Sequence, residues 1–272
     1  MKNIFIVLFV FTIGLYAYED SDMDGVEDSI DKCPNTLITD LVDINGCVIK
    51  SLVSPHHYDF ILGASYSQVD YNTNEKTDTV SENVQLDYYY KNYSLQLATS
   101  YFNSDSPTYS TNGLNDTFLA GYYGMKPLKN LSARVGVGII LPTYDSGLNN
   151  NNTDYLVTLS LSYTLSNLNL FGGYSYTFIE DDDLDTSSVY VKYQDVNSYY
   201  IGLGFYPTSK LYLSSSYNSS DSIYEGVEVI TSASIYAYYS INQHFFTTLN
   251  YAYGLSDSAS NHSASLRIGY YF

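Results

Sequence analysis

The chain has 272 residues, and its 29 Asp and Glu against 11 Lys and Arg give a formal net charge of −18. This balance excludes a nucleic-acid-binding surface, because phosphate contacts need clustered Lys and Arg. The composition, with 33 Tyr and no Trp, is unusual for a soluble enzyme. After Leu15 the sequence has neither an apolar run long enough for a membrane helix nor a convincing amphipathic helix. We therefore expect an almost entirely β-structured protein.

Residues 1–17 have the pattern of a secretory signal peptide. Lys2 precedes an apolar run from Ile4 to Leu15, and the small residue Ala17 follows at a suitable cleavage position. The run is too short to cross a bilayer as a helix, which disfavours a retained anchor. No Cys stands at the cleavage point, so we expect an exported chain without a lipid anchor there.

An acidic segment, residues 18–50, has the spacing of a calcium-binding loop. Carboxylates occupy positions 1, 3, 5, 9 and 12 of a twelve-residue stretch, with Gly25 at position 6. Ca²⁺ takes roughly six to eight oxygen ligands, alternating Asp residues let a short backbone wrap it, and glycine permits the sharp turn. The predicted ligands are Asp20, Asp22, Asp24, the carbonyl of Val26, Asp28 and Asp31.

The two cysteines, Cys33 and Cys47, follow this loop, and in an exported protein we expect them to form one disulfide. Closing a loop of this size stabilises by about 3 kcal/mol. The acidic loop, Lys32 to Thr36 and Val42 to Cys47 together resemble a thrombospondin type 3 repeat, like those in linkers of the outer-membrane protein A family. The resemblance implies the same calcium ligands, the same cysteine bridge and an affinity on the order of 10⁻⁴ to 10⁻³ M. A disordered acidic tail is the alternative, which the cysteine pair disfavours.

A linker at residues 51–57 leads into residues 58–272, which have the pattern of a transmembrane β-barrel. Apolar side chains recur at every second position, most clearly from Asp154 to Leu165, where they alternate with Thr and Ser. A strand places these two sets on opposite faces. The polar face carries Ser, Thr, Gly and Asn rather than solvated charges, which favours a lipid-facing exterior around a polar lumen. We predict an all-β, antiparallel, up-and-down barrel of about 12 strands.

The connections between the predicted strands alternate in length. Long segments rich in Asn, Asp and Ser lie near residues 71–81, 103–115, 144–153, 180–196, 218–227 and 256–262. Short links lie at residues 91–92, 126–130, 166–167, 207–210 and 242–244. Long external loops and short periplasmic turns are typical of outer-membrane barrels of Gram-negative bacteria, and this order places both chain ends and the calcium module in the periplasm.

The chain ends on an alternating strand whose last residue is Phe272, with Tyr270 two positions earlier. This ending resembles the C-terminal assembly signal of outer-membrane barrels. The resemblance implies the barrel assembly machinery and outer-membrane lipids as partners.

Enzyme barrels of similar size exist, so we asked whether any of the four histidines could act as a catalytic residue. His56 and His57 precede the first predicted strand, His244 lies in a periplasmic turn and His262 in an external loop. No predicted strand carries a His beside a Ser on the lipid face near the outer rim, which a lipase of this class would need. We therefore expect no enzymatic activity.

Alternation directs four charged residues into the lumen, all in its periplasmic half: Asp59, Asp87, Arg134 and Arg267. They form either a charged constriction that selects solutes or a structural network, and the second is the commoner use of such groups. We interpret the chain as a narrow passive diffusion channel for small solutes or cations. A non-conducting structural or adhesive surface barrel is the alternative. The acidic excess favours cation passage, and it equally serves to keep the loops solvated.

Overall fold

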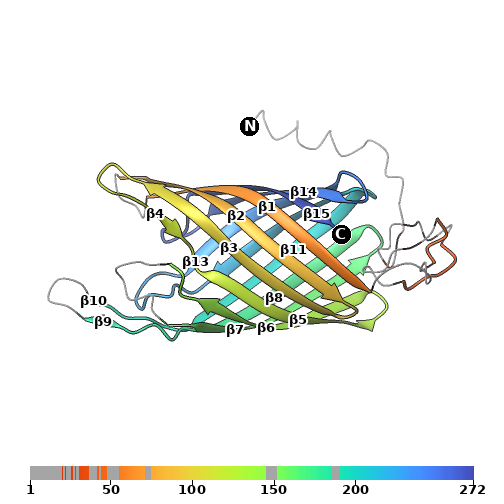
Figure 1. The fold of residues 1–272 in the computed structure, drawn as a ribbon, viewed down its shortest axis with the longest axis horizontal. Coiled ribbons are helices and arrows are strands. Elements are labelled where there is room, and N and C mark those ends of the chain that lie inside the picture. The colour runs from red at the N-terminus through yellow and green to blue at the C-terminus, as the bar shows by residue number, and fades with distance from the viewer. Residues whose placement is uncertain are drawn as a thin grey trace, which may run out of the picture.

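The protein is described here from a computed structural model, which defines residues 20, 22, 26, 28, 31–36, 42, 44–47, 55–70, 75–144, 152–185 and 190–272. The predicted signal peptide and most of the predicted linker lie outside these residues. Twelve antiparallel strands form one closed barrel (Figure 1). They are β1 (His56–Val69), β2 (Thr77–Tyr90), β3 (Tyr93–Asp105), β5 (Thr117–Leu128), β6 (Leu131–Leu141), β7 (Asp154–Leu165), β8 (Leu168–Phe178), β11 (Val196–Thr208), β12 (Leu211–Ser220), β13 (Ile230–Ser240), β14 (Phe245–Gly254) and β15 (His262–Tyr271).

Each strand pairs with its neighbour in sequence, and β1 pairs with β15 to close the ring. The seam is tied by two backbone hydrogen bonds at the end that carries the C-terminus. The amide of Tyr58 donates to the carbonyl of Phe272 at 2.8 Å, and the amide of Phe272 donates back at 3.0 Å. Closure satisfies the backbone groups that an open sheet would leave unpaired at its edges, which is a requirement inside a membrane. The prediction of a twelve-stranded antiparallel barrel is confirmed.

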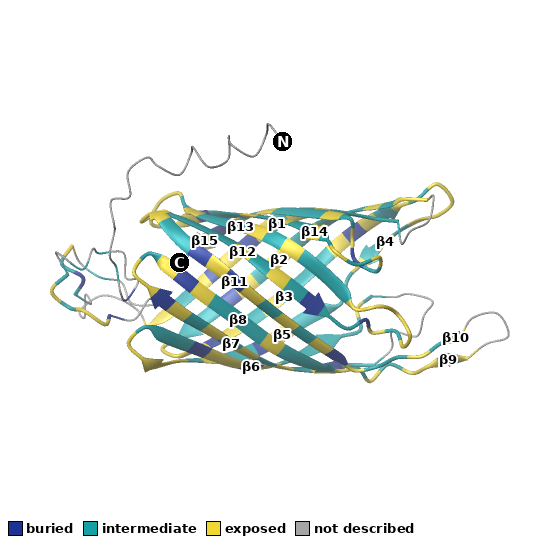
Figure 2. Cartoon of the chain, turned by 180° about the vertical axis from the view of Figure 1, so that it is seen from behind, coloured by how far each residue is buried: buried dark blue, intermediate teal, exposed yellow. Residues whose placement is uncertain are grey.

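The two faces of each strand differ as the alternation predicts. On β7 the outward Val157, Leu159 and Leu161 are between 41% and 45% exposed, whereas the inward Thr164 is 6% exposed. Figure 2 shows the resulting pattern, in which exposed positions alternate with less exposed ones along the strands. Outward apolar side chains on every strand give the barrel a surface suited to lipid tails. Among the described residues no helix could span a bilayer.

The connections separate the two ends of the barrel (Figure 1). The tight turns after β2 and β7 each contain one residue with positive φ, Lys91 at 53° and Ser166 at 54°, each followed by Asn. These conformations suit two-residue hairpins, because their twist matches that of the paired strands. The C-terminus lies at this same end, and the long connections gather at the other.

Two of the expected long loops contain additional strands. β4 (Ser110–Leu114) pairs with the end of β3, although this region was expected to be a loop from residue 103 onward. β9 (Leu184–Asp185) and β10 (Tyr190–Val191) form a small hairpin that projects beyond the barrel rim (Figure 1). The polar composition of these segments does not predict strands, because strands outside the membrane need no apolar face.

The described part of the N-terminal module is held by a disulfide between Cys33 and Cys47, whose Cα atoms are 4.9 Å apart. The predicted pairing is therefore confirmed. Thr36 is buried beside the bridge, and its hydroxyl donates to the carbonyls of Cys33 and Gly46, each at 2.8 Å. Gly46 adopts a φ of 74°, a conformation that glycine takes without steric cost.

Candidate functional site: the two walls of the lumen

The four predicted lumen charges lie on the inner face; Asp59, Asp87 and Arg267 come from strands at or beside the seam, and Arg134 comes from β6. Asp59 on β1 stands directly across from Asp87 on β2, and the two side chains are 7% and 8% exposed. Arg267 on β15 lies opposite Gly63 of β1, on the same inner face as Asp59. Arg134 reaches the group from β6. Strand pairing therefore brings together residues that are far apart in the sequence.

The described residues include no direct ion pair between these Asp and Arg side chains. Instead, an amide side chain links Arg267 to Asp87. Arg267 donates from Nη1 to Oε1 of Gln85 at 3.2 Å, and Nε2 of Gln85 donates to Oδ2 of Asp87 at 2.7 Å. The Asp87 carboxylate thus has a hydrogen-bond partner that offsets part of the cost of its burial.

Arg134 is held by a ring and a hydroxyl. Its guanidinium carbon lies 3.7 Å from the centre of the Tyr122 ring, and its Nη2 donates to Oγ of Ser94 at 3.0 Å. The Tyr122 hydroxyl in turn donates to Oε1 of Gln96 at 3.1 Å. A Cβ on Gly136, the cross-strand partner of Tyr122, would collide with this ring. Glycine therefore lets the ring lie flat on the wall beneath the arginine. We call this side of the lumen, formed by β15, β1, β2, β3, β5 and β6, the charged wall.

Aromatic rings line the opposite side of the barrel, in the half nearer the tight turns. Their inward positions follow from the strand registers and lie on β8, β11, β12 and β13: Phe171, Tyr200, Tyr206, Tyr212, Tyr236 and Tyr238. Ring centres are 4.7 Å apart for Tyr206 and Tyr212 and 6.4 Å apart for Tyr212 and Tyr236. No inward position of β8, β11, β12, β13 or β14 carries a charged side chain. We call this side the aromatic wall.

Nearer the long loops, the inner surface of the aromatic wall changes to small polar side chains. A lumen cavity of about 570 Å³ extends from the rings to Ser216, Asn218, Ser234 and Asn250. Oγ of Ser216 and Oγ of Ser234 are 2.8 Å apart, and Nδ2 of Asn218 donates to Ser234 at 3.1 Å. The cavity therefore has an aromatic floor and a wall of hydroxyl and amide groups.

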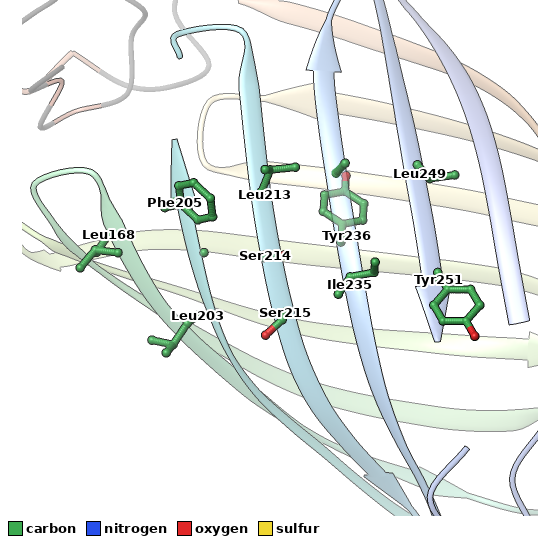
Figure 3. Close-up of a pocket in the computed structure, with 12 residues that line it drawn as sticks. Leu168, Leu203, Phe205, Leu213, Ser214, Ser215, Ile235, Tyr236, Leu249 and Tyr251 are labelled. Atoms are coloured by element: carbon green, nitrogen blue, oxygen red, sulfur yellow. The ribbon is translucent and has the colours of Figure 1, made fainter. Parts of the chain in front are cut away.

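The outer surface of the same strands has a separate hollow of about 450 Å³ (Figure 3). Its lining is dominated by outward apolar side chains, including Leu203, Leu213, Ile235 and Leu249. These side chains are suited to lipid tails, and no converging set of polar groups accompanies them. We therefore place the candidate site in the lumen rather than in this hollow.

At the loop end, two long connections bind each other. Lys192 forms an ion pair with Glu225, with 2.5 Å between Nζ and Oε2, and the Glu225 amide donates to the Lys192 carbonyl at 2.8 Å. Oδ2 of Asp195 accepts from the Tyr176 hydroxyl at 2.6 Å, and its Oδ1 accepts from the Ile179 amide at 3.0 Å. These bonds to the charged form lower the pKa of Asp195 below its ordinary value. The β9–β10 region is thereby anchored to the rim.

The histidine positions differ in part from expectation. β1 begins at His56, so His56 and His57 pair with Tyr90 and Tyr89 instead of preceding the strand. His262 is not in a loop: it is the first residue of β15, on the outer face, with Nδ1 2.8 Å from the Tyr251 hydroxyl. Its strand neighbours across the sheet are Gln68 and Tyr253 rather than a serine. His244 lies in the short turn, as predicted.

The C-terminal aromatics pack on the outside of the seam. The Phe272 ring stacks on the Tyr58 ring with 5.5 Å between ring centres, and the ring centres of Tyr270 and Phe245 are 4.9 Å apart. These contacts place an aromatic cluster at the end of the barrel that carries the tight turns.

In the N-terminal module, two of the predicted ligands, Asp22 and Asp31, each carry one buried carboxylate oxygen without a hydrogen-bond partner. The other oxygen of Asp22 accepts from the Thr36 amide, and Oδ1 of Asp31 accepts from the Cys33 amide at 2.7 Å. Asp28 and Val26 are among the described residues, and Asp24 lies outside them. In that described part, no group of three or more His, Cys, Asp or Glu side chains is gathered closely enough to hold a metal.

The aromatic wall is the feature that sequence reasoning missed. Alternation places Tyr200, Tyr212 and Tyr236 on the same face of their own strands as the small residues Gly202, Ser214 and Ser234. Tyrosine is so abundant in this chain that an individual inward Tyr does not stand out from ordinary strand propensity.

Comparison with solved structures identifies the same architecture in outer-membrane channels. The chain is similar to an outer membrane channel from Pseudomonas putida F1, with a TM-score of 0.69 and 12% sequence identity over 81% of this chain and 97% of that one. It is also similar to the NanC porin, with a TM-score of 0.51 and 15% identity over 79% of this chain and 98% of that one. At these identities the likeness shows the fold alone. No family model and no curated protein sequence matches the chain.

Proposed function

We propose that the protein is a narrow passive diffusion channel of the outer membrane and has no enzymatic function. The observation that carries this proposal is the lumen cavity of about 570 Å³ with its small hydroxyl and amide lining. Side chains fill the interior of an eight-stranded barrel, whereas a twelve-stranded barrel is wider. The fold shared with an outer membrane channel supports the same conclusion.

In the membrane, the outward apolar side chains contact outer-membrane lipids, and the tight turns and both chain ends face the periplasm. The barrel assembly machinery would insert the chain by way of its last strand, which ends on Phe272. Small solutes or cations would enter past the acidic long loops and pass between the charged and aromatic walls. Loop carboxylates raise the local cation concentration by their field, which favours cation entry.

Planar-bilayer recording with the purified full-length chain tests the channel directly. We expect discrete conductance steps with a preference for cations over anions in a salt gradient. A barrel that folds and inserts but never conducts would contradict the proposal and would support the structural or adhesive alternative. Heat-modifiable migration of the same preparation shows that the barrel is folded in either case.

We also propose that residues 20–31 bind Ca²⁺ weakly in the periplasm. The support lies in the carboxylate oxygens of Asp22 and Asp31 that are buried without a hydrogen-bond partner, because buried anionic oxygens are costly unless a cation compensates them. Asp20, Asp24, Asp28 and the Val26 carbonyl would complete the oxygen-rich shell that a hard cation prefers.

Calorimetric titration of Ca²⁺ into the full-length oxidised protein tests this second proposal. We expect saturable binding with a dissociation constant on the order of 10⁻⁴ to 10⁻³ M, abolished when Asp22→Asn and Asp31→Asn are combined. Asp257→Asn, which changes one exposed acidic residue of the β14–β15 loop, is the control. Equal heats for all three proteins would sink the assignment, because the loop carboxylates would then account for the binding.

A further inference from the structure

The lining of the cavity on the aromatic wall restricts the kind of solute that can bind there. Its ring-bearing residues are Phe171, Tyr200, Tyr212 and Tyr236, and its polar residues are serines and asparagines. None of the side chains that line it is charged. Its volume of about 570 Å³ falls within the range of roughly 300–1,000 Å³ typical of small-molecule sites.

The rings come from four adjacent strands and are arranged as steps rather than as one flat stack. Phe171 and Tyr200 lie 6.2 Å apart between ring centres at 48°, and Tyr212 and Tyr236 lie 6.4 Å apart at 62°. The hydroxyls of Tyr200 and Tyr212 are directed to wall residues, donating to Ser160 at 2.9 Å and Asn169 at 3.3 Å. Tethering by these bonds fixes the rings as surfaces on which a solute can lie.

The polar groups beside the rings keep hydrogen-bonding capacity for a solute. A serine hydroxyl offers one donor and two acceptor sites, and an asparagine amide offers two donors and two acceptor sites. The contacts between Ser216, Asn218, Ser232 and Ser234 use only some of these sites. An apolar solute would leave the remaining groups unsatisfied, which is costly once water is displaced.

The charged groups of the lumen do not line this cavity. Asp87 and Arg267 are joined through the Gln85 amide on the charged wall, and Arg134 borders a neighbouring lumen cavity of about 520 Å³ that also reaches Phe171 and Tyr200. A solute in the aromatic-wall cavity itself would therefore contact no charged side chain. A ligand suited to that wall is uncharged, carries many hydroxyls and has a C–H face that can lie against a ring, whose π face is negative.

We propose that the cavity of the aromatic wall is a binding site for neutral polyhydroxylated ring compounds, that is, for uncharged saccharides. Sugar C–H faces stack on Tyr212 and Tyr236, and sugar hydroxyls bond to Ser216, Asn218 and Ser234. This inference rests on the proposed channel function, since a saccharide bound there would be a solute in transit. The site extends from the rings, nearer the tight turns, towards the long loops, so a solute entering between the long loops meets its polar wall first and its rings next.

Single-channel recording with neutral glucose oligomers tests the site. We expect maltotriose to interrupt the current in a saturable manner, and Tyr236→Ala to raise the half-blocking concentration about tenfold through loss of a stacking ring. Tyr236→Phe should retain the block because the ring remains. Tyr217→Ala, on the outward face of the adjacent strand β12, is the matched control and should behave as the unmodified protein.

Two further probes separate specific recognition from simple obstruction. Polyethylene glycol of the same hydrodynamic size should reduce the current without saturation, and galacturonate trimers should bind more weakly than maltotriose. Equal effects of all three probes, or tighter binding of the acidic trimer, would overturn the saccharide proposal while conductance itself upheld the channel.

A barrel that does not conduct would remove the channel proposal but would still leave the site open to measurement. Calorimetry with maltotriose, in an amine-oxide detergent that has no sugar headgroup, measures binding to the folded protein directly. Saturable heat that Tyr236→Ala abolishes and Tyr217→Ala does not would support the site. Absence of saturable heat would overturn it.

Discussion

The charged wall and the aromatic wall are built from the same antiparallel strands, yet their inward side chains fill space in different ways. On the charged wall, long side chains reach one another through the Gln85 amide, and the cavity that borders Gln85 and Arg267 has only about 150 Å³, whereas the cavity beside Arg134, which also reaches Phe171 and Tyr200, has about 520 Å³. On the aromatic wall, rings lie beside glycines and serines and leave about 570 Å³. Polar networks consume lumen volume because every member needs a partner, whereas rings and small hydroxyls leave room for a solute.

Opening the seam should have the largest effect, because both walls depend on closure of the barrel. Deleting Phe272 removes the two backbone bonds to Tyr58, each worth about 1 kcal/mol, together with a stacked ring. We expect the folded, heat-modifiable band in outer-membrane fractions to fall roughly 30-fold, because the two bonds together contribute about 2 kcal/mol. Phe272→Tyr should assemble normally. An undiminished yield from the deletion would show that the terminal residue is dispensable.

Neutralising the carboxylates of the charged wall should change selectivity without changing the fold. Asp59→Asn with Asp87→Asn leaves Arg134 and Arg267 as the remaining lumen charges of this network. A charge acts on an ion 4 Å away by about 1 kcal/mol in water, so each removal should shift the cation-to-anion permeability ratio about fivefold toward anions. Reversal potentials in a salt gradient measure the shift. An unchanged potential would mean that these residues do not face the ion path.

Close packing of a glycine against a ring of the aromatic wall gives a third prediction. A Cβ on Gly202 would collide with the Phe171 ring and lie 2.6 Å from the carbonyl oxygen of Ser215. We expect Gly202→Ala to lower the free energy of unfolding by about 1–3 kcal/mol, as overpacking does. Urea titration in detergent measures it. Gly121→Ala is the control, because an added Cβ there would meet Leu95 at an ordinary 3.4 Å.

The smallest effect concerns the rim and depends on pH. The bonds from Tyr176 and Ile179 lower the pKa of Asp195 below the ordinary 3.8. Their stabilisation is therefore fully present above that ordinary value and is lost as the pH falls through the lower pKa of the folded protein. We expect hydrogen exchange at the Ile179 amide to accelerate only below about pH 4, and Asp195→Asn to remove this pH dependence. Acceleration near pH 6 would contradict the assignment.

Alternation and turn chemistry were sufficient to predict the barrel. Period-two patterning on β7 requires two distinct faces, and Lys91 and Ser166, each followed by Asn, occupy turns whose positive φ such short links require. β4 and the β9–β10 hairpin escaped prediction because strands above the membrane have no apolar face. The aromatic wall also escaped it, since the partner of each inward Tyr depends on cross-strand register, which sequence periodicity alone does not define.

The seam also determines which strand pairing forms last. Every other pair in the barrel joins consecutive membrane strands, so each can form as a hairpin soon after its two strands come together. The pairing of β1 with β15 joins segments from opposite ends of the barrel sequence, and its closure entropy is the largest. Until closure, β1 and the last strand added to the growing sheet are both free edges able to pair with another strand. We therefore expect protection of these two edges during insertion to be the step at which the barrel is most exposed to misassembly.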